Sequence, residues 1–284
     1  MSDTTPTPGD SKNYKFVDPS GSQRGGLGGL FESALRRFKT LLHLMMILPL
    51  YVLGSGILGL SVAPGVYLVS WASAGSMGWS AWARSWAIGS AVVGAIFLTG
   101  VMMIFILPAT NRVFMLLLGG GLKPWRGPYY SLEAIRWYIH NGITYMLRYT
   151  VLELFTPSPL AHVFYKMMGM KIGDGAVINT TAISDPSLIR IGEKVTLGGS
   201  VTIVAHYGQG GYLVLAPVEI GDGATIGLKA SVMGGAKIGK GAKILPHSVV
   251  MPKTVVPDGE TWGGVPAQKL DLRATVTPRD PKGA

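Results

Sequence analysis

Residues 220–256 read IGDGATIGLKASVMGGAKIGKGAKILPHSVVMPKTVV. An aliphatic residue stands at every sixth position from Ile220 to Val256, and glycine or another small residue recurs between them. This period predicts short strands that each bury one aliphatic side chain and stack coil upon coil at about 4.8 Å. An ordinary β-sandwich would not keep one register over so many consecutive repeats. We therefore predict a β-solenoid.

The same hexad begins upstream at Ile172, Ile191 and Leu197. We assign residues 171–268 to an all-β parallel β-helix built from hexapeptide repeats. A C-terminal tail follows over 269–284. The solenoid thus occupies the last third of the chain.

The period breaks at two places. The side between Ser184 and Arg190 is one residue too long, and eleven residues instead of six separate Ile203 from Val214. The second break pushes His206 and its neighbours out of the coil. Loops ejected from a regular scaffold commonly carry function.

The N-terminal half has a different character. Charged residues make up 14% of the chain and mean hydropathy is +0.36, whereas a soluble domain carries about 25% charged residues. Residues 41–63 and 87–107 are almost free of charge, and each is long enough to cross about 30 Å of hydrocarbon. We predict a transmembrane helical hairpin over 36–112, preceded by a disordered arm over 1–35.

Basic residues set the expected orientation. Arginines and lysines flank the outer ends of both spans, whereas the connector over 73–85 holds only Arg84 together with interface-type tryptophans. The positive-inside rule then places both termini and the β-helix on the cytoplasmic face of a bacterial-type inner membrane. A third weak span over 64–83 is the alternative, and it would reverse the C-terminal half.

Residues 113–170 are expected to form juxtamembrane helices. Apolar residues recur with helical spacing from Ser131 to Phe155, and tyrosines and tryptophans accompany them. This pattern fits an interfacial helix lying on the membrane. It fits equally an amphipathic helix packed on a protein core. A short helix to Met168 then leads into the solenoid.

The hexads resemble the left-handed β-helix acyltransferase superfamily, and Trp262-Gly-Gly-Val-Pro-Ala resembles its closing motif. Residues 125–267 are similar, more closely, to the membrane-bound C-terminal region of poly-lysine-synthetase-type non-ribosomal peptide synthetases. The shared landmarks are Asp185-Pro-Ser-Leu-Ile-Arg-Ile-Gly, the His206 segment with Leu215-Ala-Pro-Val-Glu-Ile-Gly, and Trp262. The resemblance implies a left-handed coil, a homotrimer, and acyl transfer from acyl-CoA or a carrier-protein thioester.

The resemblance also implies roles for single residues. His206 would be the general base and Asp185 would orient it or the acceptor. The substrate-binding candidates are Asn179, Tyr207, Gln209 and His247. The donor-binding candidates are Leu228, Lys229, Pro246 and Lys253; the superfamily has small residues near positions 228 and 246, so the larger Leu228 and Pro246 favour a donor other than coenzyme A.

Counting the long segment 203–213 as one side predicts how these residues align. The sides that start at 203, 226 and 244 would then share one face. His206 and His247 would lie two coils apart, roughly 10 Å.

Other chemistries find little support in the sequence. The absence of cysteine excludes disulfides and thiolate ligands. A three-histidine zinc site needs three imidazoles, and the coil holds only His206 and His247. With too few ligands, we expect no bound metal. Basic residues are scattered along the chain, so we expect no nucleic-acid partner.

The sequence thus predicts a membrane-anchored acyltransferase that moves an acyl group, acetyl or aminoacyl, from a thioester to a hydroxyl or amine. Two alternatives stay open. The coil is a non-catalytic membrane scaffold, or it is a synthetase-like module that forms peptide bonds with donors supplied by a separate carrier or adenylating protein.

Overall fold

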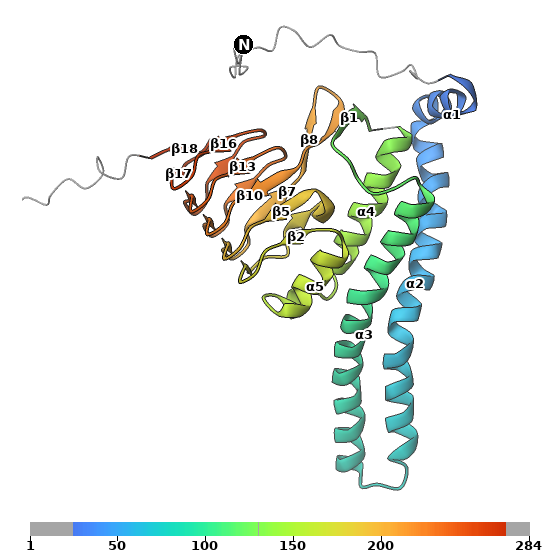
Figure 1. Ribbon diagram of the computed structural model, residues 1–284. Coiled ribbons are helices and arrows are strands. Elements are labelled where there is room, and N and C mark those ends of the chain that lie inside the picture. Colours follow the sequence, from blue (N-terminus) through green and yellow to red (C-terminus); the bar gives the residue numbers. More distant parts are fainter. Residues whose placement is uncertain (1–24, 130, 271–284) are drawn as a thin grey trace, which may run out of the picture.

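A computed structural model describes residues 25–129 and 131–270. Two long helices, α2 (Lys39–Gly75) and α3 (Ala81–Leu117), form a hairpin whose turn lies far from the β-strands (Figure 1). Parts of both helices are long and apolar enough to cross a membrane. Helix α2 runs without interruption past residue 63, where the sequence predicted the first span to end. Residues 64–75 therefore belong to that helix, not to a separate span.

A shorter helix precedes the hairpin. Helix α1 (Gly26–Arg37) occupies the last part of the region that the sequence predicted to be a disordered arm. That expectation is therefore wrong for residues 26–35, while residues 1–24 lie outside the described residues. The predicted tail over 269–284 likewise lies mostly outside them; strand β18 (Gln268–Lys269) pairs antiparallel with β17 (Thr261–Gly263) at its start.

Helix α3 changes its surroundings halfway along. All but one of its buried residues lie at or beyond Gly100, where the helix packs against the solenoid side of the molecule. The Gly100 position admits no side chain, because a Cβ there would lie 2.4 Å from the ring of Phe155. The first half of α3, with Trp82 and Trp86 exposed, runs beside the second half of α2, and this part of the hairpin extends beyond the rest of the protein (Figure 1).

Three short helical segments connect the hairpin to the solenoid. They are α4 (Leu132–Arg148), the 3-10 helix η2 (Leu152–Phe155) and α5 (Pro159–Met167). The apolar spacing predicted one helix to Phe155, but α4 ends at Arg148. Helix α4 packs on α3 and on the coil, burying Ala134 and Leu147 completely, while Tyr149 stays exposed. The second interpretation, a helix packed on protein, therefore holds for its apolar face.

The solenoid consists of three parallel sheets, one for each side of the coil. Equivalent aliphatic residues stack in register, as Ile203 does on Val232 and Val232 on Val250. Their side chains fill the interior and are almost fully buried. The strands of the first sheet are β2 (Lys171–Ile172), β5 (Ile189–Ile191), β10 (Val218–Ile220), β13 (Lys237–Ile238) and β16 (Val255–Val256). Those of the second are β3 (Val177–Ile178), β6 (Thr196–Leu197), β11 (Thr225–Ile226), β14 (Lys243–Ile244) and β17. Those of the third are β4 (Ile183–Ser184), β7 (Thr202–Val204), β12 (Ser231–Val232) and β15 (Val249–Val250).

The long break in the period is a β-hairpin. Strands β8 (His206–Gln209) and β9 (Tyr212–Leu215) pair antiparallel, and β1 (Trp125–Pro128) adds a third strand to β9 (Figure 1). The hairpin leaves the coil after β7 and returns at β10, so it occupies one corner and contributes no side. Counting it as a side was therefore wrong, and Val214 belongs to the hairpin, where it pairs with Tyr207.

Candidate functional site

The corner at which the hairpin leaves the coil brings His206 and Asp185 together. The Nδ1 atom of His206 lies 2.6 Å from Oδ2 of Asp185. The aspartate side chain has no exposed surface, and the histidine side chain is 21% exposed. An ionised carboxylate can only accept hydrogen bonds, so Nδ1 of His206 is the donor and Nε2 is left with a free lone pair. The pair has the arrangement of a general base with an orienting acid.

Helix α4 supplies the other partners of Asp185. The indole Nε1 of Trp137 and the amide Nδ2 of Asn141 each donate a hydrogen bond of 2.8 Å to Oδ1. The ring of Trp137 also meets the ring of His206 edge-on, with 5.0 Å between centroids. The carboxylate therefore accepts three hydrogen bonds, which compensates its burial.

Side chains and backbone around the hairpin cover His206 more than the sequence predicted. A residue projecting from a loop was expected to bury little, yet most of the imidazole is covered. Tyr207, a predicted substrate-binding residue, is 8% exposed within β8. Gly234 packs beneath the corner, where a Cβ would lie 3.2 Å from the backbone nitrogen of His206. Gln209, the other predicted residue of this hairpin, lies exposed near its tip.

The remaining predicted residues lie on two different edges of the coil. Lys253 is on the edge of His206: its backbone nitrogen bonds to the oxygen of Gly234, the glycine under that corner. The other edge follows the β3–β6–β11–β14 sheet. It carries Asn179, Leu228, Lys229, Pro246 and His247.

The predicted alignment of His206 with His247 is therefore wrong. Ile226 pairs with Leu197 and Ile244, whereas Ile203 pairs with Val232, which in turn pairs with Val250. Within one chain, the predicted donor residues Leu228, Lys229 and Pro246 thus lie across a whole sheet from the histidine–aspartate pair.

A second row of polar residues lies behind the pair. His140 of α4 is buried; its Nδ1 lies 3.2 Å from Oδ1 of Asn111 and its Nε2 lies 3.4 Å from Oγ of Ser187. Burial lowers the pKa of His140 to about 4, although nearby Asp185 acts in the opposite direction. At neutral pH this imidazole is uncharged, so Nδ1–H donates to Asn111 and Nε2 accepts from Ser187.

Sequence reasoning missed Trp137, Asn141 and His140 as parts of the site. Trp137 was counted among the aromatic residues of an interfacial helix. The available signal was their spacing: Trp137 and Asn141 are four residues apart and so share one face of a helix. The sequence does not indicate that this face of the helix packs against Asp185, on the side of the coil that is one residue too long.

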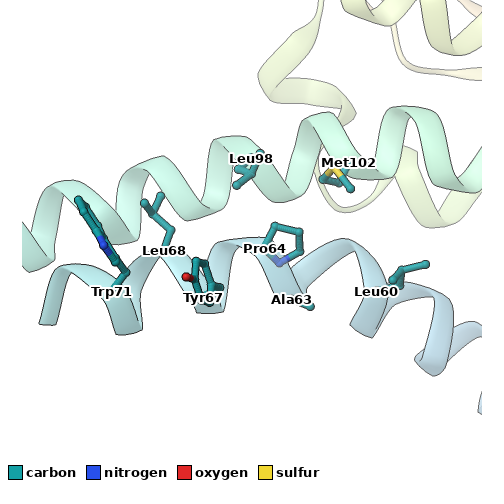
Figure 2. Close-up of a pocket in the computed structure, with 8 residues that line it drawn as sticks. All are labelled: Leu60, Ala63, Pro64, Tyr67, Leu68, Trp71, Leu98 and Met102. Atoms are coloured by element: carbon teal, nitrogen blue, oxygen red, sulfur yellow. The ribbon is translucent and has the colours of Figure 1, made fainter. Parts of the chain in front are cut away.

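A separate apolar groove lies between the two long helices (Figure 2). Its volume is about 630 Å³, and its lining comes from α2 and α3 near the exposed half of the hairpin. The lining residues are Leu60, Ala63, Pro64, Tyr67, Leu68, Trp71, Leu98 and Met102. The groove contains no acid, base or nucleophile of the predicted site. Among the described residues, no three side chains of the metal-binding types gather into a candidate metal site.

The chain is similar in sequence to known proteins. No family model matches the chain. Delta-poly-L-ornithine synthetase of Acinetobacter baumannii is 30% identical over 176 residues, which is 62% of this chain but 13% of that protein. The acetyltransferase-like protein YvoF of Bacillus subtilis is 25% identical over 162 residues, covering 52% of this chain and 91% of that one.

A maltose O-acetyltransferase from Clostridium difficile 630 aligns with 52% of this chain and 91% of its own, at 18% identity and a TM-score of 0.40. The hexad period, the three stacked sheets and the sequence matches agree with one another. The coil of this chain is similar to hexapeptide-repeat acyltransferases of the β-helix type.

Proposed function

We propose that this chain is a membrane-anchored acyltransferase in which His206 is the general base. The observation that supports this most is the short hydrogen bond between His206 Nδ1 and the fully buried Asp185. It fixes the tautomer that leaves Nε2 able to accept a proton. Imidazole suits the role because its ordinary pKa lies near neutrality.

The proposed reaction is a direct transfer. The acceptor hydroxyl or amine gives its proton to Nε2 of His206 while its oxygen or nitrogen attacks the carbonyl carbon of a thioester. The tetrahedral intermediate then collapses, the carbon–sulfur bond breaks, and the leaving thiolate takes the proton back from Nε2. Asp185 stabilises the imidazolium that exists between these steps. The products are an ester or amide and a free thiol.

The donor is proposed to be acyl-CoA or an acyl group on a carrier protein. Homologous structures include a galactoside acetyltransferase in complex with coenzyme A. The 30% sequence identity to a poly-ornithine synthetase favours a second candidate donor. This donor is an aminoacyl thioester that a separate carrier or adenylating protein delivers. Leu228, Lys229, Pro246 and Lys253 are the proposed donor contacts, and Asn179, Gln209, Tyr207 and His247 the proposed acceptor contacts.

The hairpin is proposed to anchor the enzyme in a membrane. From Ala81 to Gly100, α3 is largely exposed and apolar. Twenty helical residues rise about 30 Å, which matches the hydrocarbon thickness of a bilayer. The apolar groove of Figure 2 would then face lipid chains. The proposed arrangement has a left-handed coil, three chains per assembly and the coil on the cytoplasmic face.

Mass spectrometry of lipids and small metabolites tests the proposal. Cells with the wild-type chain should contain an acylated product that is missing when the chain is missing. His206→Ala should lower its formation by about 10²–10⁴-fold, the usual effect of losing a positioned general base. Lys243→Ala is the control, because it removes an exposed side chain of β14 that is neither a proposed donor contact nor a proposed acceptor contact. Unchanged product in folded His206→Ala would reject catalysis and favour the scaffold.

A further inference from the structure

The face of α4 toward the coil carries two donors that meet on one atom. Trp137 and Asn141 lie one helical turn apart, and both donate to Oδ1 of Asp185. The other carboxylate oxygen, Oδ2, is left to His206. The two oxygens thus have different partners from different parts of the chain, α4 on one side and the hairpin corner on the other.

We propose that α4 is a working part of the catalytic centre, in which Trp137 and Asn141 are positioning residues that hold Asp185 so that His206 keeps its proton on Nδ1. This inference rests on the proposed function, since it names the groups that keep the proposed base in its active form.

The two donors restrict rotation of the Asp185 carboxylate. A buried carboxylate that accepted only from His206 could rotate about its Cβ–Cγ bond and exchange its two oxygens. Two donors on Oδ1 oppose that rotation, because each would lose an acceptor on a carboxylate that has no exposed surface. Trp137 acts on both members of the pair, since its ring also packs edge-on against His206. Without these contacts, the imidazole would be free to turn and to place its proton on Nε2, where it blocks general-base catalysis.

The second polar row fixes α4 itself. His140 lies between Trp137 and Asn141 in sequence and connects Asn111 of α3 with Ser187, two residues after Asp185. These contacts tie the helix at one side to the long hairpin and at the other to the turn that carries the aspartate. The position of α4 along the coil is therefore set by both parts of the molecule, which a positioning helix requires.

Nitrogen-15 NMR of the histidine rings tests this without any substrate. The full-length protein, labelled with ¹⁵N-histidine in detergent micelles, should show His206 as the Nδ1–H tautomer, assigned by its loss in His206→Ala. Trp137→Phe keeps the aromatic ring and removes the donor, and Asn141→Leu keeps the volume and removes the other donor. The double variant should show a mixture of tautomers, and product formation in cells should fall about 10- to 100-fold. In the Trp137→Phe background, replacing Asn141→Leu by Asn141→Gln restores an N–H donor and should return the Nδ1–H signal.

Gly142→Ala is the control on the same helix, because a Cβ there meets nothing within 4 Å. It should leave the tautomer unchanged. If the double variant keeps a single Nδ1–H tautomer, α4 is only a packing element and the inference is rejected. If the double variant does not fold, the single Trp137→Phe variant decides by the same signal. The proposed function fails separately, through unchanged product in His206→Ala, while the tautomer result would still stand.

Discussion

At the scale of single residues, Asp185 combines two tasks. Its backbone has φ 59° and ψ 50°, the left-handed conformation that aspartate tolerates better than most residues. This turn accommodates the extra residue in the side between Ser184 and Arg190 and points the carboxylate toward His206. The turn conformation and the proposed role beside His206 are therefore compatible in one residue.

His140 predicts a dependence of stability on pH. Burial lowers its pKa from 6.5 to about 4 in the folded chain. As the pH falls, the unfolded chain therefore binds the proton at a higher pH than the folded chain does. The contribution of neutral His140 to the free energy of unfolding is fully present above pH 6.5 and is lost as the pH falls toward 4. The loss should be roughly 3 kcal/mol, from 1.36 kcal/mol per pKa unit. Thermal unfolding between pH 4.5 and 7.5 measures it.

His140→Gln should flatten that dependence, and His247→Gln, on the exposed edge, should not. An equally steep acid loss in His140→Gln would assign the effect to other groups.

At the scale of elements, the solenoid was predictable and the site was only partly so. A six-residue period fixes which residues face inward, and residues such as Ile226, Ile238 and Val250 lie there. His206 and Asp185 could be singled out because both fall where the period fails, and the resemblance to the acyltransferases implied their roles. The β8–β9 hairpin could not be recognised, since a hairpin and an oversized side contain the same apolar residues. Its misassignment shifted every later side by one face. The Trp137 and Asn141 contacts needed the tertiary placement of α4, which helical spacing does not specify.

The junction between α3 and η2 predicts a sharp difference between two glycines of one helix. Gly100→Ala would place a Cβ 2.4 Å from a carbon of the Phe155 ring, and that ring is buried. Overpacking of this kind costs about 1–3 kcal/mol. Gly89→Ala should not destabilise, because a Cβ there meets nothing within 4 Å. Thermal unfolding of both variants in the same detergent compares them, and equal losses would show that α3 does not dock through this contact.

At the scale of the whole molecule, the proposed orientation in the membrane rests on the basic flanks and the hairpin. The natural chain has no cysteine, so single-cysteine labelling is free of background. Met77→Cys, in the exposed turn between α2 and α3, should react with a membrane-impermeant maleimide added to intact cells. Lys243→Cys, exposed on the coil, should react only after the membrane is opened. The reverse pattern would place the coil outside.

The separation of the two edges predicts that a complete site needs two chains. On one chain, the β4–β7–β12–β15 sheet lies between the corner of His206 and the edge of Leu228 and Lys229. Threefold packing would bring the first edge of one chain against the second edge of its neighbour. His206→Ala and Leu228→Trp should each be inactive alone. The first lacks the base, and in the second a larger side chain at the exposed position 228 (47% in Leu228) would obstruct the proposed donor contacts.

Coexpression of the two variants should restore activity. With random mixing, a working site needs a Leu228→Trp chain, which has His206, beside a His206→Ala chain, which has Leu228. The chance is one half times one half, so about a quarter of wild-type product is expected from a cyclic assembly. The detergent-corrected mass of the mixture must correspond to three chains. If such trimers form and no product returns, the shared site is rejected. If Leu228→Trp is active without its partner variant, the donor binds along the His206 edge, where Lys253 lies.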